Sequence, residues 1–410
     1  MQMKMIFPEL RVEDVTSNIS QKYTDVMKNS GLFNYGAKLE AWLSDDSSHS
    51  LGYSTHGLFR FFGKFPPTIA RHLIQRYSKG EDLVIDPMCG SGTTAVEAVL
   101  LNRKLICFDI NPLAVLLAKV KITYISSNEY ELYFNQILSN IKNIQQPSPE
   151  YCYLGQLKNS KHWFLEETIQ SLGIIKQAIS ISDIPPEIKD VFMVIFLSIV
   201  RRVSNATNQQ GRLFLDVETA EKNAIPFFIN KAQKSRDMFS SVPEHNESEI
   251  FRGSILKKED LPLKQAPLII CHPPYFNNYK YSSINSLELA WMGENTDVLR
   301  KHEIREAFKI GKPEKVHDYV DDVQKALINL HELLNGDGVL ALMIGDTIMK
   351  EQFIPVTSMI LDGLKKHYDI ENIAFRIPKY TEASWAASLR RKKTQLGVNM
   401  CDYVISLRKI

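Results

Sequence analysis

Short apolar runs alternate with stretches of helical periodicity in two separate parts of the chain. The apolar runs are bounded by charged or turn-forming residues and predict strands at 83–85, 104–108, 250–255, 266–271, 339–344, 370–377 and 402–407. Amphipathic spacing between them predicts helices at 68–77, 93–101, 113–121, 319–334 and 353–367. Strands that alternate with helices are typical of an α/β fold with a mainly parallel sheet, in which the last strand returns as an antiparallel partner.

The segment between the second and third predicted strands has a different pattern. Residues 126–245, roughly 120 positions, are too long for a simple crossover connection. Helical periodicity recurs within them at 166–179 and 187–201. We therefore predict an inserted, mainly helical subdomain at 126–245. Residues 55–125 and 246–410 then form one domain, and residues 1–54 are expected to be a helical N-terminal segment.

Composition and charge exclude several classes of protein. The 410 residues are 44% hydrophobic and carry a formal net charge of only +2, so a nucleic-acid surface would have to be local. No apolar run reaches the length of a membrane span, and the first residues lack the apolar core of a signal peptide. The five cysteines stand singly, without metal-ligand spacing. We expect a reduced, cytoplasmic protein with no bound metal and no membrane contact.

A glycine turn follows the first predicted strand, in the sequence DPMCGSGTT. Gly90 and Gly92 allow the chain to turn sharply and to approach a ligand closely, because they carry no Cβ. Asp109 ends the next strand, about 20 residues further on, where an acidic side chain can bind the two hydroxyls of a ribose. The spacing is not GxGxxG, and no GK[ST] follows, so a dinucleotide or a nucleoside triphosphate is less well supported.

DPMCGSGTT followed by FDINP resembles the cofactor motif of S-adenosylmethionine-dependent DNA amino-methyltransferases. The resemblance covers about residues 55–125 and 246–410 and implies a Rossmann-like class I methyltransferase sheet. It also implies that the FGKFPP stretch closes over the methionine part of the cofactor, where Lys64 could pair with the carboxylate. The cofactor-binding residues expected from it are Lys64, Phe65, Asp86, Met88, Cys89, Gly90, Gly92, Thr93, Thr94, Asp109, Ile110, Asn111 and Ser254.

A second motif, His272-Pro273-Pro274-Tyr275, follows the apolar strand 266–271 and resembles the [D/N/S]PP[Y/F/W] motif of the same family. An exocyclic base amine is a weak nucleophile, because its lone pair is delocalised into the ring. A side-chain acceptor and a proline carbonyl can each accept one of its N–H groups and so free the lone pair for attack. The prolines fix the backbone, and Tyr275 would stack on a base flipped out of the duplex.

His272 departs from the family pattern at the position of the side-chain acceptor. A neutral imidazole has one acceptor nitrogen, so His272 can take this role, or it can accept the proton that leaves the amine. A requirement for the neutral form would make the rate fall below roughly pH 6.5. The substitution also admits an inactive protein, and it prevents use of the rule that links the first motif residue to the methylated base.

Several polar residues are candidates for DNA contact. Asn277 and Tyr281 match the PPYxNxxxY pattern of the family and could line the pocket of the flipped base. Arg201 and Arg202 open a stretch rich in Arg, Asn and Gln, which are the side chains that read base edges. Arg390 and Arg391 lie in a basic run that could neutralise phosphates. A solvated loop is the alternative for each basic stretch.

The sequence thus predicts a DNA methyltransferase that uses S-adenosylmethionine, acts on double-stranded DNA and has a restriction endonuclease as a candidate partner. Cytosine N4 is favoured over adenine N6, because HGxxRxxGKFPP and PPYxNxxxY resemble enzymes of that kind. A tRNA guanine-N2 methyltransferase and a catalytically idle DNA-binding subunit are the alternatives. A cytosine C5 mechanism through Cys271 is disfavoured, because this thiol ends an apolar strand rather than lying in an exposed loop.

Overall fold

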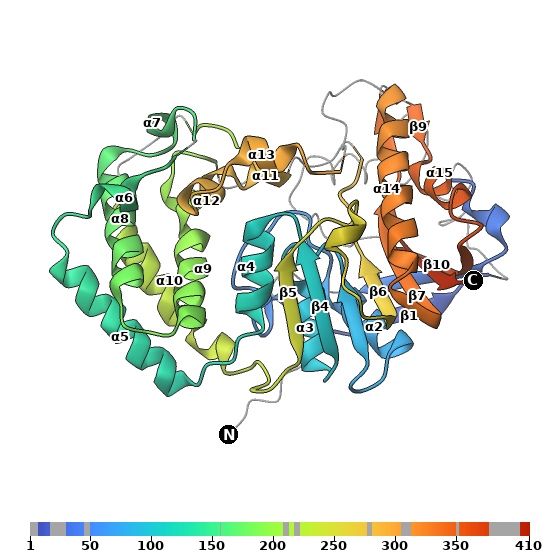
Figure 1. The fold of residues 1–410 in the computed structure, drawn as a ribbon, viewed down its shortest axis with the longest axis horizontal. Coiled ribbons are helices and arrows are strands. Elements are labelled where there is room, and N and C mark those ends of the chain that lie inside the picture. Colours follow the sequence, from blue (N-terminus) through green and yellow to red (C-terminus); the bar gives the residue numbers. More distant parts are fainter. Residues whose placement is uncertain are drawn as a thin grey trace.

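The computed structural model describes residues 7–16, 30–44, 50–155, 157–207, 213–216, 222–276, 281–304, 313–349, 352–376 and 402–410. A nine-stranded sheet runs through the molecule in the order β1-β2-β10-β11-β7-β6-β3-β4-β5 (Figure 1). Its main strands are β3 (Leu83–Asp86), β4 (Lys104–Asp109), β5 (Ser248–Arg252), β6 (Ala266–Cys271), β7 (Leu334–Gly345), β10 (Tyr368–Arg376) and β11 (Asp402–Lys409). From β5 to β7 neighbouring strands pair in parallel, whereas β11 is antiparallel to both β7 and β10.

Helices cover both faces of this sheet because its central strands are apolar on both faces. Val84 of β3 faces a core that includes α2 and α3, whereas the next residue, Ile85, faces the core under α14 and α15. The helices around the sheet are α2 (Pro67–Tyr77), α3 (Thr93–Leu100), α4 (Pro112–Lys121), α14 (Val316–His331) and α15 (Val356–Asp362). The segment predicted as one helix at 353–367 instead holds the end of β9 (Gln352–Ile354), which pairs with β8 (Thr347–Met349), and then α15.

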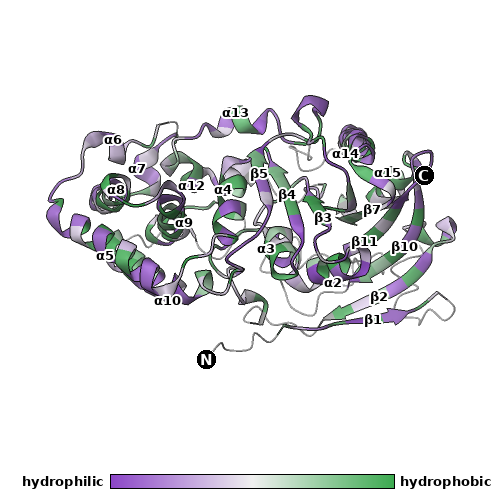
Figure 2. Ribbon diagram, turned by 60° about the horizontal axis from the view of Figure 1, so that its bottom comes forward, coloured by the Kyte–Doolittle hydropathy of each residue, from purple (hydrophilic) through white to green (hydrophobic). Residues whose placement is uncertain are grey.

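The N-terminal segment corrects the prediction of a helical region at 1–54. Its described residues contain two strands, β1 (Leu10–Asp14) and β2 (Lys38–Ser44), and the 3-10 turns η1 (Leu32–Tyr35) and η2 (Ser50–Gly52). β2 extends the sheet beyond β10, and β1 forms its outer edge. The buried Glu40 carboxylate accepts hydrogen bonds from Arg76 of α2 at 2.8 Å and from Trp42 at 2.9 Å. These partners allow a charged residue to lie inside a strand. Figure 2 shows the polar character of β1 and the apolar character of β11 and β7.

A helical layer lies beyond the β5 end of the sheet (Figure 1). It comprises α5 (Ser127–Asn143), α6 (Pro149–Cys152), α7 (Ser160–Trp163), α8 (Glu166–Ile181), α9 (Pro186–Val203) and α10 (Ala224–Phe239). α9 is apolar almost all round because it is central, and its Phe192 and Phe196 are fully buried. The same core includes Trp291 of α12 (Ser286–Trp291), so the helical layer packs against the segment that follows β6. Within the described ranges, no helix combines the length and apolarity that a bilayer crossing needs.

Candidate active site

The glycine turn between β3 and α3 forms the floor of the site. Gly90 and Gly92 have φ of 46° and 73°, which are left-handed conformations that favour glycine. A Cβ on Gly92 would lie 2.9 Å from the Cα of Ala118, so this glycine allows α4 to approach the turn. Below the turn, Nζ of the buried Lys121 donates to the Ser91 carbonyl at 2.7 Å. The two glycines therefore set the shape of the turn, and α4 supports it.

Asp109 joins the end of β4 to this turn. Its Oδ2 accepts a hydrogen bond from the Gly90 amide at 3.0 Å, and its Oδ1 accepts one from the Asn111 amide at 2.9 Å. Asn111 in turn caps α4, since its side chain accepts from the Leu113 amide at 3.0 Å. Burial raises the pKa of Asp109 to about 6, although both amide donors favour the ionised form. The carboxylate keeps further lone pairs for the hydroxyls of a ligand.

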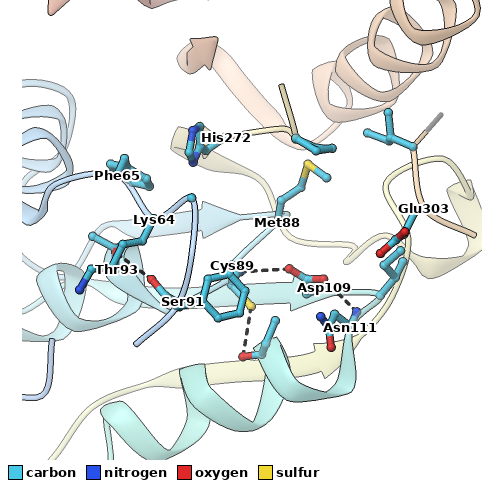
Figure 3. Close-up of a pocket in the computed structure, with 17 residues that line it drawn as sticks. Lys64, Phe65, Met88, Cys89, Ser91, Thr93, Asp109, Asn111, His272 and Glu303 are labelled. Atoms are coloured by element: carbon cyan, nitrogen blue, oxygen red, sulfur yellow. Dashed lines mark hydrogen bonds between the residues drawn. The ribbon is translucent and has the colours of Figure 1, made fainter. Parts of the chain in front are cut away.

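A cavity opens above the turn and extends to the motif after β6. Its volume is about 770 Å³, including the solvent at its mouth. Figure 3 shows Lys64, Phe65 and His272 on one side of the cavity and Asp109, Asn111 and Glu303 on the other. The lining residues are Phe61, Gly63, Lys64, Phe65, Met88, Cys89, Gly90, Ser91, Thr93, Asp109, Ile110, Asn111, Ala114, His272, Pro274, Glu303 and Ile304.

The residues His272 to Tyr275 lie where β6 ends, at the same edge of the sheet as the glycine turn. The His272 imidazole meets the rings of Phe65 and Tyr275 edge to face, with a centroid separation of 5.3 Å in each case. The Pro274 carbonyl accepts a hydrogen bond from the Tyr319 hydroxyl of α14 at 2.7 Å. The motif is therefore held between the stretch before α2 and helix α14.

A buried polar network anchors the stretch before α2. Glu97 of α3 is fully buried and accepts hydrogen bonds from Tyr53 at 2.5 Å and from Arg71 at 2.7 Å. Its carboxylate also contacts His56 Nε2 at 2.7 Å, and burial lowers the pKa of His56 to about 4. The Lys64 ammonium donates to the His56 carbonyl at 3.4 Å. These contacts place Lys64 and Phe65 at the rim of the cavity.

Four predicted cofactor residues lie outside the cavity lining. Gly92 packs against α4, and Asp86 and Thr94 are buried beside the turn. The Asp86 carboxylate accepts from the Met88 amide at 3.1 Å, and burial raises the pKa of Asp86 to about 7. Ser254 is occupied in its own turn, where its amide donates to Asp260 at 2.9 Å. These four residues support the turn and the strand ends beside the cavity.

The predicted DNA-contact residues are dispersed. Arg201 is buried at the end of α9, where its guanidinium lies 5.1 Å from the centre of the Phe62 ring and donates to the Thr207 carbonyl at 3.2 Å. Arg201 was predicted to contact DNA, but it is buried, because it packs against Phe62, a residue distant in the sequence. Arg202 is exposed and stacks on Phe227 at 5.1 Å. Tyr281 begins α11 (Tyr281–Ile284), whereas Asn277, Arg390 and Arg391 lie outside the described residues.

Sequence reasoning missed six residues of the lining: Phe61, Gly63, Ser91, Ala114, Glu303 and Ile304. The first four lie within or beside the motifs, so the motif boundaries already carried a signal for them. Glu303 and Ile304 follow α13 (Thr296–Arg300), in a charged stretch without a motif. Their position depends on how that stretch folds back over the cavity, which no local pattern indicates.

The chain is similar in sequence to a family of DNA methylases and to individual methyltransferases. Residues 13–120 match the family model N6_N4_Mtase, described as a DNA methylase. The type II methyltransferase M.MvaI of Kocuria varians is 24% identical over 283 residues, which cover 62% of this chain and 62% of that protein. M.BsoBI of Geobacillus stearothermophilus is 24% identical over 324 residues, which cover 70% of this chain and 61% of that protein. The rRNA methyltransferase aviRa from Streptomyces viridochromogenes covers 74% of this chain and 84% of its own at 12% identity, with a TM-score of 0.33.

The strand order, the antiparallel β11 and the site at the carboxyl ends of β3, β4 and β6 define a Rossmann-like class I methyltransferase fold. Within that class, the match of residues 13–120 to the DNA methylase family model and the similarity to two type II methyltransferases support an S-adenosylmethionine-dependent DNA amino-methyltransferase. The matched part covers less than two thirds of the length of either relative.

Proposed function

We propose that the chain transfers a methyl group from S-adenosylmethionine to an exocyclic amine of a base flipped out of double-stranded DNA. One observation carries this proposal: His272 and Pro274 line the same cavity as Gly90 and Asp109. The cofactor motif and the amine motif lie far apart in the sequence. Methyl transfer requires that S-adenosylmethionine and the base amine meet in one cavity.

The cavity lining fits S-adenosylmethionine. The Asp109 carboxylate is held by two backbone amides and suits the ribose hydroxyls. Met88, Ile110 and Ala114 supply apolar surface for the adenine ring, and Lys64 at the opposite side suits the methionine carboxylate. Four more of the residues expected to bind the cofactor, Phe65, Cys89, Thr93 and Asn111, also line the cavity. When bound, this cofactor supplies a methyl group already activated by its sulfonium.

The chain's own groups would then prepare the amine. The His272 imidazole accepts one N–H of the amine through its unprotonated nitrogen. The Pro274 carbonyl is engaged by Tyr319, so we assign the second N–H to the Pro273 carbonyl. Together they weaken delocalisation of the amine lone pair, and Tyr275 stacks on the flipped base. His272 can also take the proton released after transfer.

We further propose cytosine N4 as the acceptor, ahead of adenine N6, from the resemblance of residues 56–67 and 273–281 to cytosine enzymes. We assign DNA contacts to Arg202, Arg390 and Arg391 and target recognition to the inserted helices. A cognate restriction endonuclease remains a proposed partner, in line with the type II names of the relatives. The cytoplasm remains the proposed location.

A labelling experiment tests the substrate class. The protein is incubated with methyl-labelled S-adenosylmethionine and an equal mixture of duplex DNA and transfer RNA, and the two are then separated. We expect label in the DNA and its loss in the His272→Ala variant. Label confined to the RNA would reject the proposal.

A further inference from the structure

Glu303 brings a second carboxylate into the cavity from a part of the chain that has no cofactor motif. It follows α13 and lines the cavity together with Ile304. Figure 3 shows its side chain on the side of the cavity that holds Asp109 and Asn111, away from Lys64 and His272. Burial is the main cause of the raised pKa of Asp109, and the charge of Glu303 adds to it. Both carboxylates therefore line the same side of one cavity.

Two hydrogen bonds from α11 fix the Glu303 side chain. The Ser282 amide donates to Oε1 at 3.0 Å, and the Ser282 hydroxyl donates to Oε2 at 3.1 Å. Each carboxylate oxygen retains a further lone pair that can accept from a ligand. α11 is the first helix after His272 to Tyr275, so Glu303 joins the cofactor cavity to the segment that follows the amine motif.

A pair of carboxylates in a half-enclosed cavity favours a ligand that donates hydrogen bonds. Burial raises the pKa of Glu303, and the two hydrogen bonds from Ser282 together with the charge of Arg300 offset only part of this effect. The adenosine half of S-adenosylmethionine presents two ribose hydroxyls and the adenine amine as donors. The methionine half would lie toward Lys64, on the opposite side.

We propose that Glu303 accepts a hydrogen bond from the adenosine half of the cofactor and thereby couples cofactor binding to the position of α11. This inference rests on the proposed function, since it requires that the cavity bind S-adenosylmethionine. Glu303 lies outside both motifs. Through its hydrogen bonds with Ser282, a bound cofactor would fix the position of α11, in the segment that follows the amine motif.

Direct binding measurements test the contact without requiring turnover. The affinities of S-adenosylmethionine and S-adenosylhomocysteine are measured by calorimetry for the unaltered protein and for Glu303→Gln. We expect Glu303→Gln to weaken both ligands by about tenfold or more, because a hydrogen bond to a charged acceptor is lost. Glu167→Gln, which makes the same change at an exposed position of α8, should bind both ligands as the unaltered protein does.

Hydrogen exchange tests the coupling. The Ser282 amide donates to Glu303, so bound S-adenosylhomocysteine should slow exchange in a peptide that covers α11. Glu303→Gln should abolish this protection at ligand concentrations that saturate the variant. Ser282→Ala should weaken binding by a smaller factor, about two- to tenfold, because it removes one neutral donor.

The binding results distinguish a failure of the Glu303 contact from a failure of the cofactor assignment. No binding of either ligand to the unaltered protein would overturn both the cofactor assignment and the inference. Normal binding by Glu303→Gln would overturn the inference alone. A loss confined to S-adenosylmethionine would show that the carboxylate serves the sulfonium, which also contradicts the assignment to adenosine. Glu303→Gln could weaken the binding of both ligands equally while S-adenosylhomocysteine fails to slow hydrogen exchange in α11 of the unaltered protein. That result would retain the contact and reject the coupling.

Discussion

The Phe65 ring packs edge to face against the His272 imidazole, with their centroids 5.3 Å apart. Phe65 precedes α2 and His272 follows β6, so the contact joins two parts of the cavity lining that are far apart in the sequence. Tyr275 packs against the imidazole in the same way. Two aromatic rings therefore fix the orientation of a side chain that, in our proposal, must align with the amine of a flipped base.

Removal of the Phe65 ring should reduce turnover through misorientation of His272. We expect Phe65→Leu to lower kcat about tenfold, because a small misplacement of a catalytic group is costly. The measurement is methyl transfer to DNA at saturating cofactor and DNA. Phe33→Leu, an exposed position in η1, serves as the matched control and should behave as the unaltered protein. An unchanged kcat for Phe65→Leu would show that the ring does not position the imidazole.

Because His272 is assigned as the hydrogen-bond acceptor for the amine, its replacement by Asn and by Ala should affect activity differently. His272→Asn keeps an acceptor and matches a residue type usual in the family, so we expect activity within about tenfold of the unaltered protein. His272→Ala leaves the amine without its side-chain acceptor and should lower kcat by about a hundredfold or more. Affinity for S-adenosylhomocysteine is measured in parallel to separate catalysis from binding. Equal activity of the two variants would contradict the assigned role.

Cofactor affinity should depend on pH through Asp109. The ionised carboxylate accepts hydrogen bonds, and its pKa is raised to about 6. Affinity for S-adenosylhomocysteine should therefore be constant above about pH 7 and should fall below pH 6, by up to about tenfold per pH unit. The raised pKa of Glu303 adds to this trend. Asp109→Asn should flatten the profile in part, and Asp109→Asn with Glu303→Gln should remove it. A constant affinity down to pH 5 would argue against an ionised contact.

Gly92 should be required for folding rather than for ligand contact. Its φ is 73°, and an added Cβ would lie 2.9 Å from the Cα of Ala118. Gly92→Ala should lower the free energy of unfolding by about 3 kcal/mol. Gly336→Ala, at an exposed position with open space around it, should change it by less than about 0.5 kcal/mol. Equal thermal stability of the two variants would contradict this packing role.

Sequence patterns predicted those parts of the fold that are determined by residues close to one another in the chain. The apolar runs located the central strands, and the glycines with Asp109 located the floor of the cavity. The N-terminal strand β2 escaped prediction because its Glu40 is a poor strand signal until Arg76 of α2 pairs with it. Arg201 was predicted to contact DNA, and its burial could not be predicted because its stacking partner, Phe62, is distant in the sequence. Glu303 depended on the same kind of non-local contact.

Product analysis tests the central claim most directly. The protein is incubated with methyl-labelled S-adenosylmethionine and mixed-sequence duplex DNA, and the DNA is digested to nucleosides whose masses identify the labelled species. Our account predicts labelled N4-methylcytosine. N6-methyladenine would retain the methyltransferase and reject the assigned base. The absence of any labelled nucleoside, with cofactor binding intact, would contradict the proposal that His272 and the two prolines form a working amine site.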